Sequence, residues 1–211
     1  VGRQSPIALA ALAPACMLCD RAIYLFIFLA YTTTNFVATA RSRQDWNAEG
    51  RHVRVALTIA LACGTIMGAA MLLAGGPVLD WLAGSAAAAA LGKDARAYTA
   101  VRALGMPAAF AGIVLQAAAL GAKDWRTPMV AVLSTSVVNF SADLLLVCWL
   151  HMGVVGAAVG TVLAQVGAAA VLAQARWGRR GARAEAETPP AAAPRWPPPA
   201  AREPLLWSAG S

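Results

Sequence analysis

Apolar residues gather along this chain in five long runs, separated by short stretches that carry most of the charge. The runs cover residues 22–40, 55–75, 98–121, 128–150 and 153–175. Each is close to the roughly 20 residues that an α-helix needs to cross the hydrocarbon core of a bilayer. Because that core cannot hydrogen-bond an open backbone, each run is predicted to be helical. The pattern predicts an all-α fold, a polytopic membrane bundle of about five transmembrane helices.

Composition agrees with this pattern. Hydrophobic residues make up 59% of the 211 residues and charged residues only 13%, with a mean hydropathy of +0.60. That charged content is about half of the usual share in a soluble domain. The net charge of +7 could also suit a nucleic-acid partner. However, the basic residues lie in short clusters between apolar runs, so we predict a lipid bilayer as the partner and no nucleic acid.

The basic clusters also predict the orientation of the bundle. Many basic residues follow the first, third and fifth runs, and few lie on the opposite side. The first group is Arg41, Arg43, Arg51, Arg54, Lys123, Arg126, Arg176, Arg179, Arg180 and Arg183, and the second is Arg3, Lys93 and Arg96. The positive-inside rule places the first group on the cytoplasm-like side.

Three regions are predicted from this organisation. Residues 1–21 form an outside loop and helix lead-in, and residues 22–177 form the bundle. Residues 178–211 form a disordered tail, because the stretch ETPPAAAPRWPPPAAREP is rich in Pro, Ala and Arg and has no apolar period. An odd number of helices that starts outside suggests a further helix before Val1.

Asp143 is the most informative polar residue of the fourth run. A charged Asp near the middle of a spanning helix costs roughly 2.5–3.5 kcal/mol on insertion scales. Asn139 lies one helical turn earlier on the same face. The turn at 151–153 is so short that the next helix packs antiparallel, which brings Thr161 to a similar depth. Together these oxygens could bind a hard cation or a proton, although Asp143 could also act only in helix packing.

Further polar positions could line a substrate cavity. They are Gln116 in the third run and Thr34 and Asn35 in the first, where threonines can instead hydrogen-bond their own helix. Cys16 and Cys19 form a C-x-x-C, but no second pair or nearby His completes a zinc site. No catalytic or nucleotide-binding motif is present, so we expect neither an enzyme nor a cofactor.

Several of these segments resemble one family. LGAKDWRTPM (120–129) resembles the G-x-x-D-x-x-T-P turn between the fourth and fifth helices of the multidrug and toxic compound extrusion (MATE) transporters. The N-x-x-x-D at 139–143 and the G-x-x-G-A-A-x-x-T at 153–161 fit the first lobe of that family. Residues 11–45 look like the second helix and following loop of plant plastid-type members. Together the similarity covers about 10–175.

The resemblance implies an antiporter of two six-helix lobes, in which the five runs correspond to helices two to six of the first lobe. Such proteins export organic compounds, xenobiotics or secondary metabolites including phenolic ones, in exchange for H⁺ or Na⁺. In prokaryotic members, residues equivalent to Asn139, Asp143 and Thr161 contribute to a cation site.

The family's first helix and second lobe are absent from this sequence, so we expect a partial chain. Transport would need the missing second lobe or a partner chain, because substrate binds between two moving halves. The resemblance implies an integral membrane protein, with the plastid envelope as one candidate location. Two alternatives stay open: a related lipid-linked flippase, and a membrane anchor that does not transport.

Overall fold

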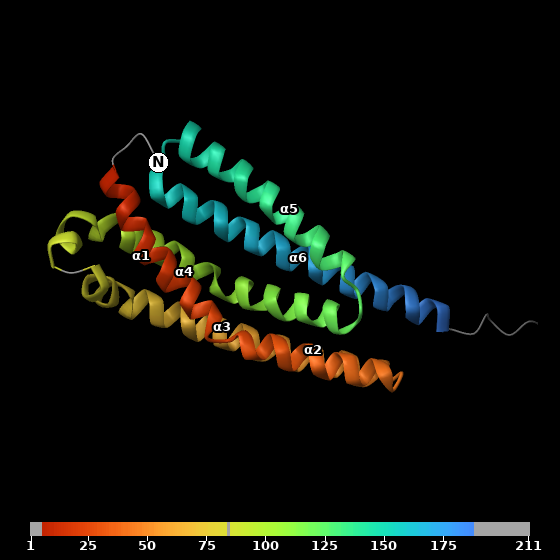
Figure 1. Cartoon of the computed structure of the whole chain (residues 1–211). Helices are drawn as coiled ribbons and strands as arrows, with labels where there is room; N and C mark the ends of the chain where they lie inside the picture. Colours follow the sequence, from red (N-terminus) through yellow and green to blue (C-terminus); the bar gives the residue numbers. More distant parts are fainter. Residues whose placement is uncertain (1–5, 84, 188–211) are drawn as a thin grey trace, which may run out of the picture. The chain divides into compact units, whose positions relative to one another are not determined.

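The computed structural model describes residues 6–83 and 85–187, and the regular elements there are all helices. They are α1 (Pro6–Tyr24), α2 (Ile27–Ser42), α3 (Trp46–Ala83), α4 (Ser85–Gly121), α5 (Arg126–Asp143), the π-helix η1 (Leu144–Trp149) and α6 (Gly153–Glu187). Five helical segments of this part are long and apolar enough to cross a membrane: Ala15–Ser42, Trp46–Trp81, Gly92–Gly121, Arg126–Trp149 and Gly153–Arg179. The predicted all-α bundle with five spans is therefore confirmed (Figure 1).

The chain divides into two compact units, Val1–Arg176 and Trp177–Ser211. The tail was predicted to be disordered from residue 178, but α6 continues to Glu187. The reason is local, because GARAEAE is rich in Ala, Arg and Glu, which favour helix. The rest of the predicted tail, 188–211, lies outside the described residues.

The first span begins earlier than the apolar run suggested. Its apolar segment starts at Ala15, and α1 begins at Pro6, inside the predicted lead-in of 1–21. The span bends at Leu25 and Phe26, where α1 ends and α2 has not yet begun. Asp20 and Arg21 precede the predicted run, and the helix carries both charges.

Glycines allow α3 and α4 to lie side by side (Figure 1). A Cβ added at Gly68 would stand 2.5 Å from the carbonyl oxygen of Ala103, and one at Gly64 would stand 2.7 Å from the Cα of Pro107. Both distances are shorter than van der Waals contact, so a side chain at either glycine would collide with the backbone of α4. Gly64 and Gly68 form the G-x-x-x-G spacing that lets membrane helices approach closely.

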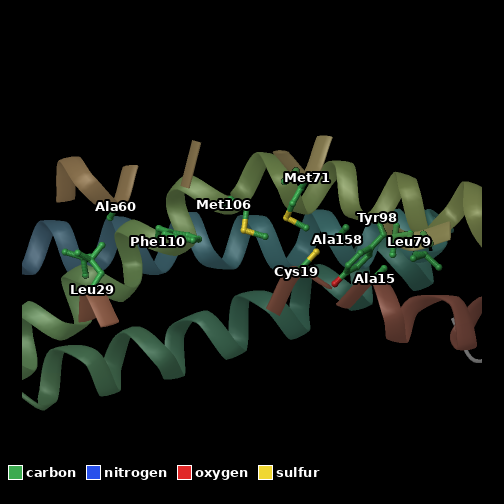
Figure 2. Packing of buried hydrophobic residues seen from close by; sticks show 14 of the residues in the cluster. Ala15, Cys19, Leu29, Ala60, Met71, Leu79, Tyr98, Met106, Phe110 and Ala158 are labelled. Atoms are coloured by element: carbon green, nitrogen blue, oxygen red, sulfur yellow. The ribbon is translucent and has the colours of Figure 1, made fainter. Parts of the chain in front are cut away.

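The core is centred on α4, the span with the largest buried share. Met106, Phe110 and Val114 of this helix are almost fully buried. They belong to one cluster with Cys19 of α1 and Ala158 of α6 (Figure 2). The span of α5 is the least buried, as expected for a helix that faces lipid over much of its surface.

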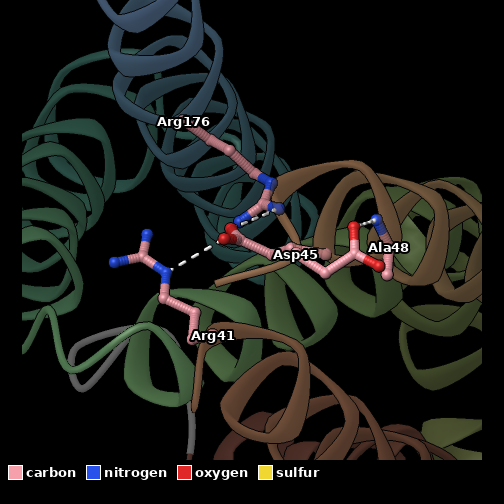
Figure 3. A network of polar contacts seen from close by, with 5 residues as sticks. Arg41, Asp45, Ala48 and Arg176 are labelled. Carbon is pink, nitrogen blue, oxygen red and sulfur yellow. Dashed lines mark hydrogen bonds and ion pairs between the residues drawn. The ribbon is translucent and has the colours of Figure 1, made fainter. Parts of the chain in front are cut away.

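Charged residues join α2, α3 and α6 at one end of the first unit. Glu49 is buried and accepts hydrogen bonds from Nε of Arg41 at 2.9 Å and from Nη2 of Arg176 at 3.1 Å. Figure 3 shows Arg41 and Arg176 converging on this point. Nearby, Asp45 caps α3 by accepting a hydrogen bond from the N–H of Ala48 at 2.8 Å. The charge pattern assigns Arg41 and Arg176 to the same side, and this contact between α2, α3 and α6 agrees with that assignment.

Replacing Glu49 with Gln is expected to destabilise the bundle by on the order of 3 kcal/mol, because Arg41 and Arg176 would both lose the buried carboxylate that they share. Arg41→Gln should cost less, about 1 kcal/mol, since the side chain of Arg41 is 27% exposed and that of Arg176 only 11%. Unfolding of the purified chain in mixed micelles measures both. Arg43→Gln, at an exposed neighbouring position, is the control. Equal losses in all three variants would contradict the specific role of Glu49.

Candidate cation site and cavity

Asp143 is the last residue of α5, and its carboxyl group lies against α6. Its Oδ1 is buried and has no hydrogen-bond partner among the described residues. A Cβ added at Gly160 would stand 2.6 Å from this Oδ1 and 3.3 Å from the Cβ of Ala142. The missing side chain of Gly160 therefore makes the space that the carboxyl group of Asp143 occupies. A buried carboxyl oxygen without a partner is costly, so it is a position where a cation or a proton would be favourable.

The two other predicted ligands lie close along the helices but do not bond to Asp143. Asn139 is half-buried and one turn before Asp143, and no hydrogen bond from its side chain occurs within the described residues. Thr161 follows Gly160 directly, and its hydroxyl donates to the carbonyl oxygen of Ala157 at 2.9 Å. The structure thus places the carboxyl group of Asp143 against Gly160, the residue before Thr161. It leaves oxygens of Asn139 and Thr161 available as acceptors.

A π-helix follows Asp143 immediately. Leu144–Trp149 forms this wider helix within the fourth membrane span. Short π-helical segments occur frequently at functional sites. The sequence LLLVCW gives no local signal for it, so sequence reasoning missed this feature. Regular α-helical hydrogen bonding therefore ends beside the carboxyl group of Asp143.

A cavity of about 590 Å³ lies between α1, α2 and α4. This volume is typical of sites for small organic ligands. Its lining comprises Asp20, Ile23, Tyr24, Ile27, Ala30, Tyr31, Thr34, Ile113, Gln116, Ala117 and Leu120. Two of the predicted cavity residues, Thr34 and Gln116, are among them. Asn35 is exposed and does not line this cavity.

The threonine hydroxyls of α2 mostly bond their own helix. Thr32 and Thr33 donate to the carbonyl oxygens four residues earlier, at 2.9 and 2.7 Å. Thr34 donates to Ala30 at 3.0 Å and also reaches the carbonyl oxygen of Ala117 on α4 at 3.2 Å. Thr34 therefore links two walls of the cavity.

Sequence reasoning missed an ion pair at the cavity wall. Nη2 of Arg102 on α4 lies 3.5 Å from Oδ1 of Asp20 on α1. The side chain of Arg102 is 5% exposed, whereas that of Asp20 is 60% exposed. The sequence signal for this pair was the position of Arg102 inside the apolar run 98–121. Asp20 was missed because it lies before residue 22, where the first apolar run was predicted to begin.

The C-x-x-C residues contribute to packing around this pair. Cys19 is buried, and the thiol of Cys16 donates to the Tyr98 hydroxyl at 3.2 Å. Within the part of the chain that the structure describes, no group of three or more His, Cys, Asp or Glu side chains could hold a metal ion.

The turn between α4 and α5 has a structural role. Asp124 accepts hydrogen bonds from the N–H and the hydroxyl of Thr127, at 3.2 and 2.6 Å, and so caps the start of α5. A Cβ at Gly121 would stand 2.6 Å from the carbonyl oxygen of Thr34, so this glycine permits the close approach of α2 and α4. The G-x-x-D-x-x-T spacing of 121–127 thus shapes a helix–helix connection.

The MatE family model matches residues 1–145. The chain belongs to the MATE transporter family. It is 34% identical over 172 residues to the chloroplastic protein DETOXIFICATION 47 of Arabidopsis thaliana, covering 79% of this chain and 30% of that protein. It is 31% identical over 166 residues to the DNA damage-inducible protein F of Escherichia coli, covering 77% of this chain and 35% of that protein.

Two solved MATE structures share this fold. One, an inward-facing multidrug resistance transporter, superposes with a TM-score of 0.71 at 24% identity, covering 80% of this chain and 38% of the other. A MATE protein in a bent conformation gives 0.72 at 23% identity, covering 83% and 39%. The chain thus spans about a third of the length of these four MATE relatives.

Proposed function

We propose that this chain forms most of the first lobe of an antiporter that exports organic compounds in exchange for H⁺ or Na⁺. The observation that carries the proposal is the buried Oδ1 of Asp143, which has no hydrogen-bond partner among the described residues and lies inside a membrane span. Keeping an acid there has an energetic cost that a role in cation binding would explain. Asn139 and Thr161 would supply neutral oxygens to the same cation.

Exchange requires that the acid can release what it binds. Asp143 sits where α5 meets both η1 and the Gly160 turn of α6, so a small shift between these helices would change the surroundings of its carboxyl group. Such a shift would couple cation binding to the shape of the bundle. The separate cavity with Thr34 and Gln116 would hold the organic substrate.

The names of the relatives bear on the general role and on the location that we propose. The name of the Escherichia coli relative refers to DNA damage, and those of two Arabidopsis relatives to detoxification and the chloroplast. We extend these names to an export substrate among xenobiotics or phenolic metabolites, and to the plastid envelope as the location.

Transport from lipid vesicles tests this proposal. Two proteins are reconstituted: this chain alone, and this chain extended by the segments that flank it in its gene. Efflux of a fluorescent organic compound is followed under an imposed pH gradient, an imposed Na⁺ gradient, or neither. We expect the extended protein to export only under one of the gradients, and the short chain not to export. Export that ignores both gradients would refute coupling, and export by the short chain alone would refute the need for a second half.

A further inference from the structure

A second, smaller cavity lies between α3 and α4 and has a volume of about 290 Å³. Its described walls come from residues between 71 and 77 of α3 and between 96 and 100 of α4. None of these residues lines the cavity that holds Thr34 and Gln116. The second cavity is therefore a separate site, to which the proposed antiport assigns no role.

This cavity lies where the apolar part of two helices ends. Leu73 falls inside the apolar run 55–75 and Thr99 inside the run 98–121, whereas Arg96 falls just outside. The cavity thus has an apolar part at the depth of the acyl chains and a basic group at the depth of the lipid headgroups. The charge pattern predicts that this level belongs to the leaflet opposite the basic loops.

Two hydrogen-bond donors line the cavity. Thr99 is 2% exposed, and its buried hydroxyl has no hydrogen-bond partner among the described residues, which is costly unless a ligand supplies one. Arg96 pairs with Oδ2 of Asp80 through Nη2, yet 54% of its side chain stays exposed. A Cβ added at Gly76 would stand 3.5 Å from Nε of Arg96, so the glycine leaves room beside this nitrogen. The cavity can therefore donate to a ligand from both Thr99 and Arg96.

The wall from α3 adds an acceptor and an apolar surface. Pro77 has no N–H, so the carbonyl oxygen of Leu73 lacks the donor that it would have in a regular helix. Both residues line the cavity. Leu72 and Leu73 are 50% and 83% exposed, and they lie in a membrane span, so their side chains face the acyl chains of the bilayer. A fitting ligand carries an anionic group, a hydroxyl and a long apolar part.

We infer that this cavity binds the headgroup of a membrane phospholipid. Its phosphate accepts hydrogen bonds from Arg96 and Thr99, which are charge-assisted and therefore strong. The acyl chains lie outside the cavity, along Leu72 and Leu73. Asp80 competes with the phosphate for the guanidinium of Arg96 and so limits the affinity. The site lies outside the substrate cavity and apart from Asp143, so the inference does not depend on transport.

Native mass spectrometry of the purified full chain tests this inference. Dioleoyl phosphatidylglycerol is compared with dioleoylglycerol, which has the same acyl chains and no phosphate. We expect one tightly bound phospholipid, and no dioleoylglycerol above the detergent background. Thr99→Val and Arg96→Gln should each weaken phospholipid binding about tenfold or more, because each removes a donor to a charged group. Asp80→Asn should tighten it, because the guanidinium of Arg96 then has no competing carboxylate. Arg54→Gln, an exposed position near the start of α3, should leave it unchanged.

Thr99→Val decides the question even if another variant fails to fold. Valine has nearly the shape of threonine and removes only a hydroxyl without a partner, so the unfolding midpoint should not fall. Unchanged phospholipid binding by Thr99→Val would overturn the inference, as would equal binding of the two lipids by the unmodified chain. Displacement of the lipid by inorganic phosphate would also overturn it, because free phosphate would then be the ligand. Retention of the lipid in excess phosphate supports a phospholipid.

Discussion

Replacing Asp143 with Asn is expected to abolish gradient-driven export by the extended protein, with a loss of at least about a hundredfold in initial rate. Asn has nearly the same shape and can still fill the space beside Gly160, but it carries no charge and releases no proton. The amide at this position would then have no proton or negative charge with which to exchange a cation. Efflux from vesicles under the effective gradient measures the change.

A control must show that the loss is specific to this carboxyl group. Asp94→Asn also removes one carboxylate, at an exposed position outside the candidate site, and should leave export unchanged. Both variants should show the same unfolding midpoint within error. Normal export by the Asp143→Asn protein would eliminate the cation-coupling role. The remaining explanation for Asp143 would then be helix packing.

The second large effect is expected from one added methyl group. Gly68→Ala should destabilise the bundle by about 2 kcal/mol, because the new Cβ would stand 2.5 Å from the carbonyl oxygen of Ala103. That atom belongs to the backbone of α4, so the collision can be relieved only if α3 and α4 move apart. Such a movement would also disturb Met106 and the core around it.

Gly112→Ala provides the matched control, because the same substitution there meets no atom within 4 Å. Its helix should gain up to about 1 kcal/mol, since Ala favours helix more than Gly does. The two variants therefore predict opposite signs for one chemical change. Denaturant midpoints of the purified chains in mixed micelles give the comparison. If Gly68→Ala were as stable as Gly112→Ala, the close contact between α3 and α4 would not exist in the protein.

The long-range architecture of the chain could be predicted because membrane insertion leaves strong signals in sequence. Five apolar runs gave five spans, since the bilayer demands length and low polarity from each helix. The short turn before Gly153 predicted that the next helix runs antiparallel to α5. This arrangement predicted similar depths for Asp143 and Thr161. In the structure, Asp143 lies against Gly160, the residue before Thr161.

The polar contacts could not be predicted in the same way, because they depend on which helix faces which. The pairing of Asp20 with Arg102 joins residues 82 positions apart, and that of Arg176 with Glu49 joins residues 127 positions apart. Hydropathy places Arg102 inside an apolar run and the other three residues outside the runs, but it does not say which residues pair. Only the packed bundle shows that Arg102 and Glu49 are buried and that each has a partner.

Local backbone features were missed for another reason. The π-helix at Leu144–Trp149 has no side-chain capping hydrogen bond and contains no proline or glycine that would predict it. The continuation of α6 to Glu187 reflects helix-favouring residues that a reading based on hydropathy undervalues. In both cases the hydropathy pattern predicted the membrane span correctly. It did not predict the type of helix within the span or the residue at which the helix ends.

Infrared difference spectroscopy of the purified chain tests the role of Asp143 most directly. Spectra at acid and alkaline pH, with and without Na⁺, report the C=O band of a protonated carboxyl group. We expect a band that disappears as the pH rises or as Na⁺ is added, that Asp143→Asn lacks, and that Asp94→Asn retains. Identical difference spectra for the unmodified chain and Asp143→Asn would contradict reversible cation binding at this residue.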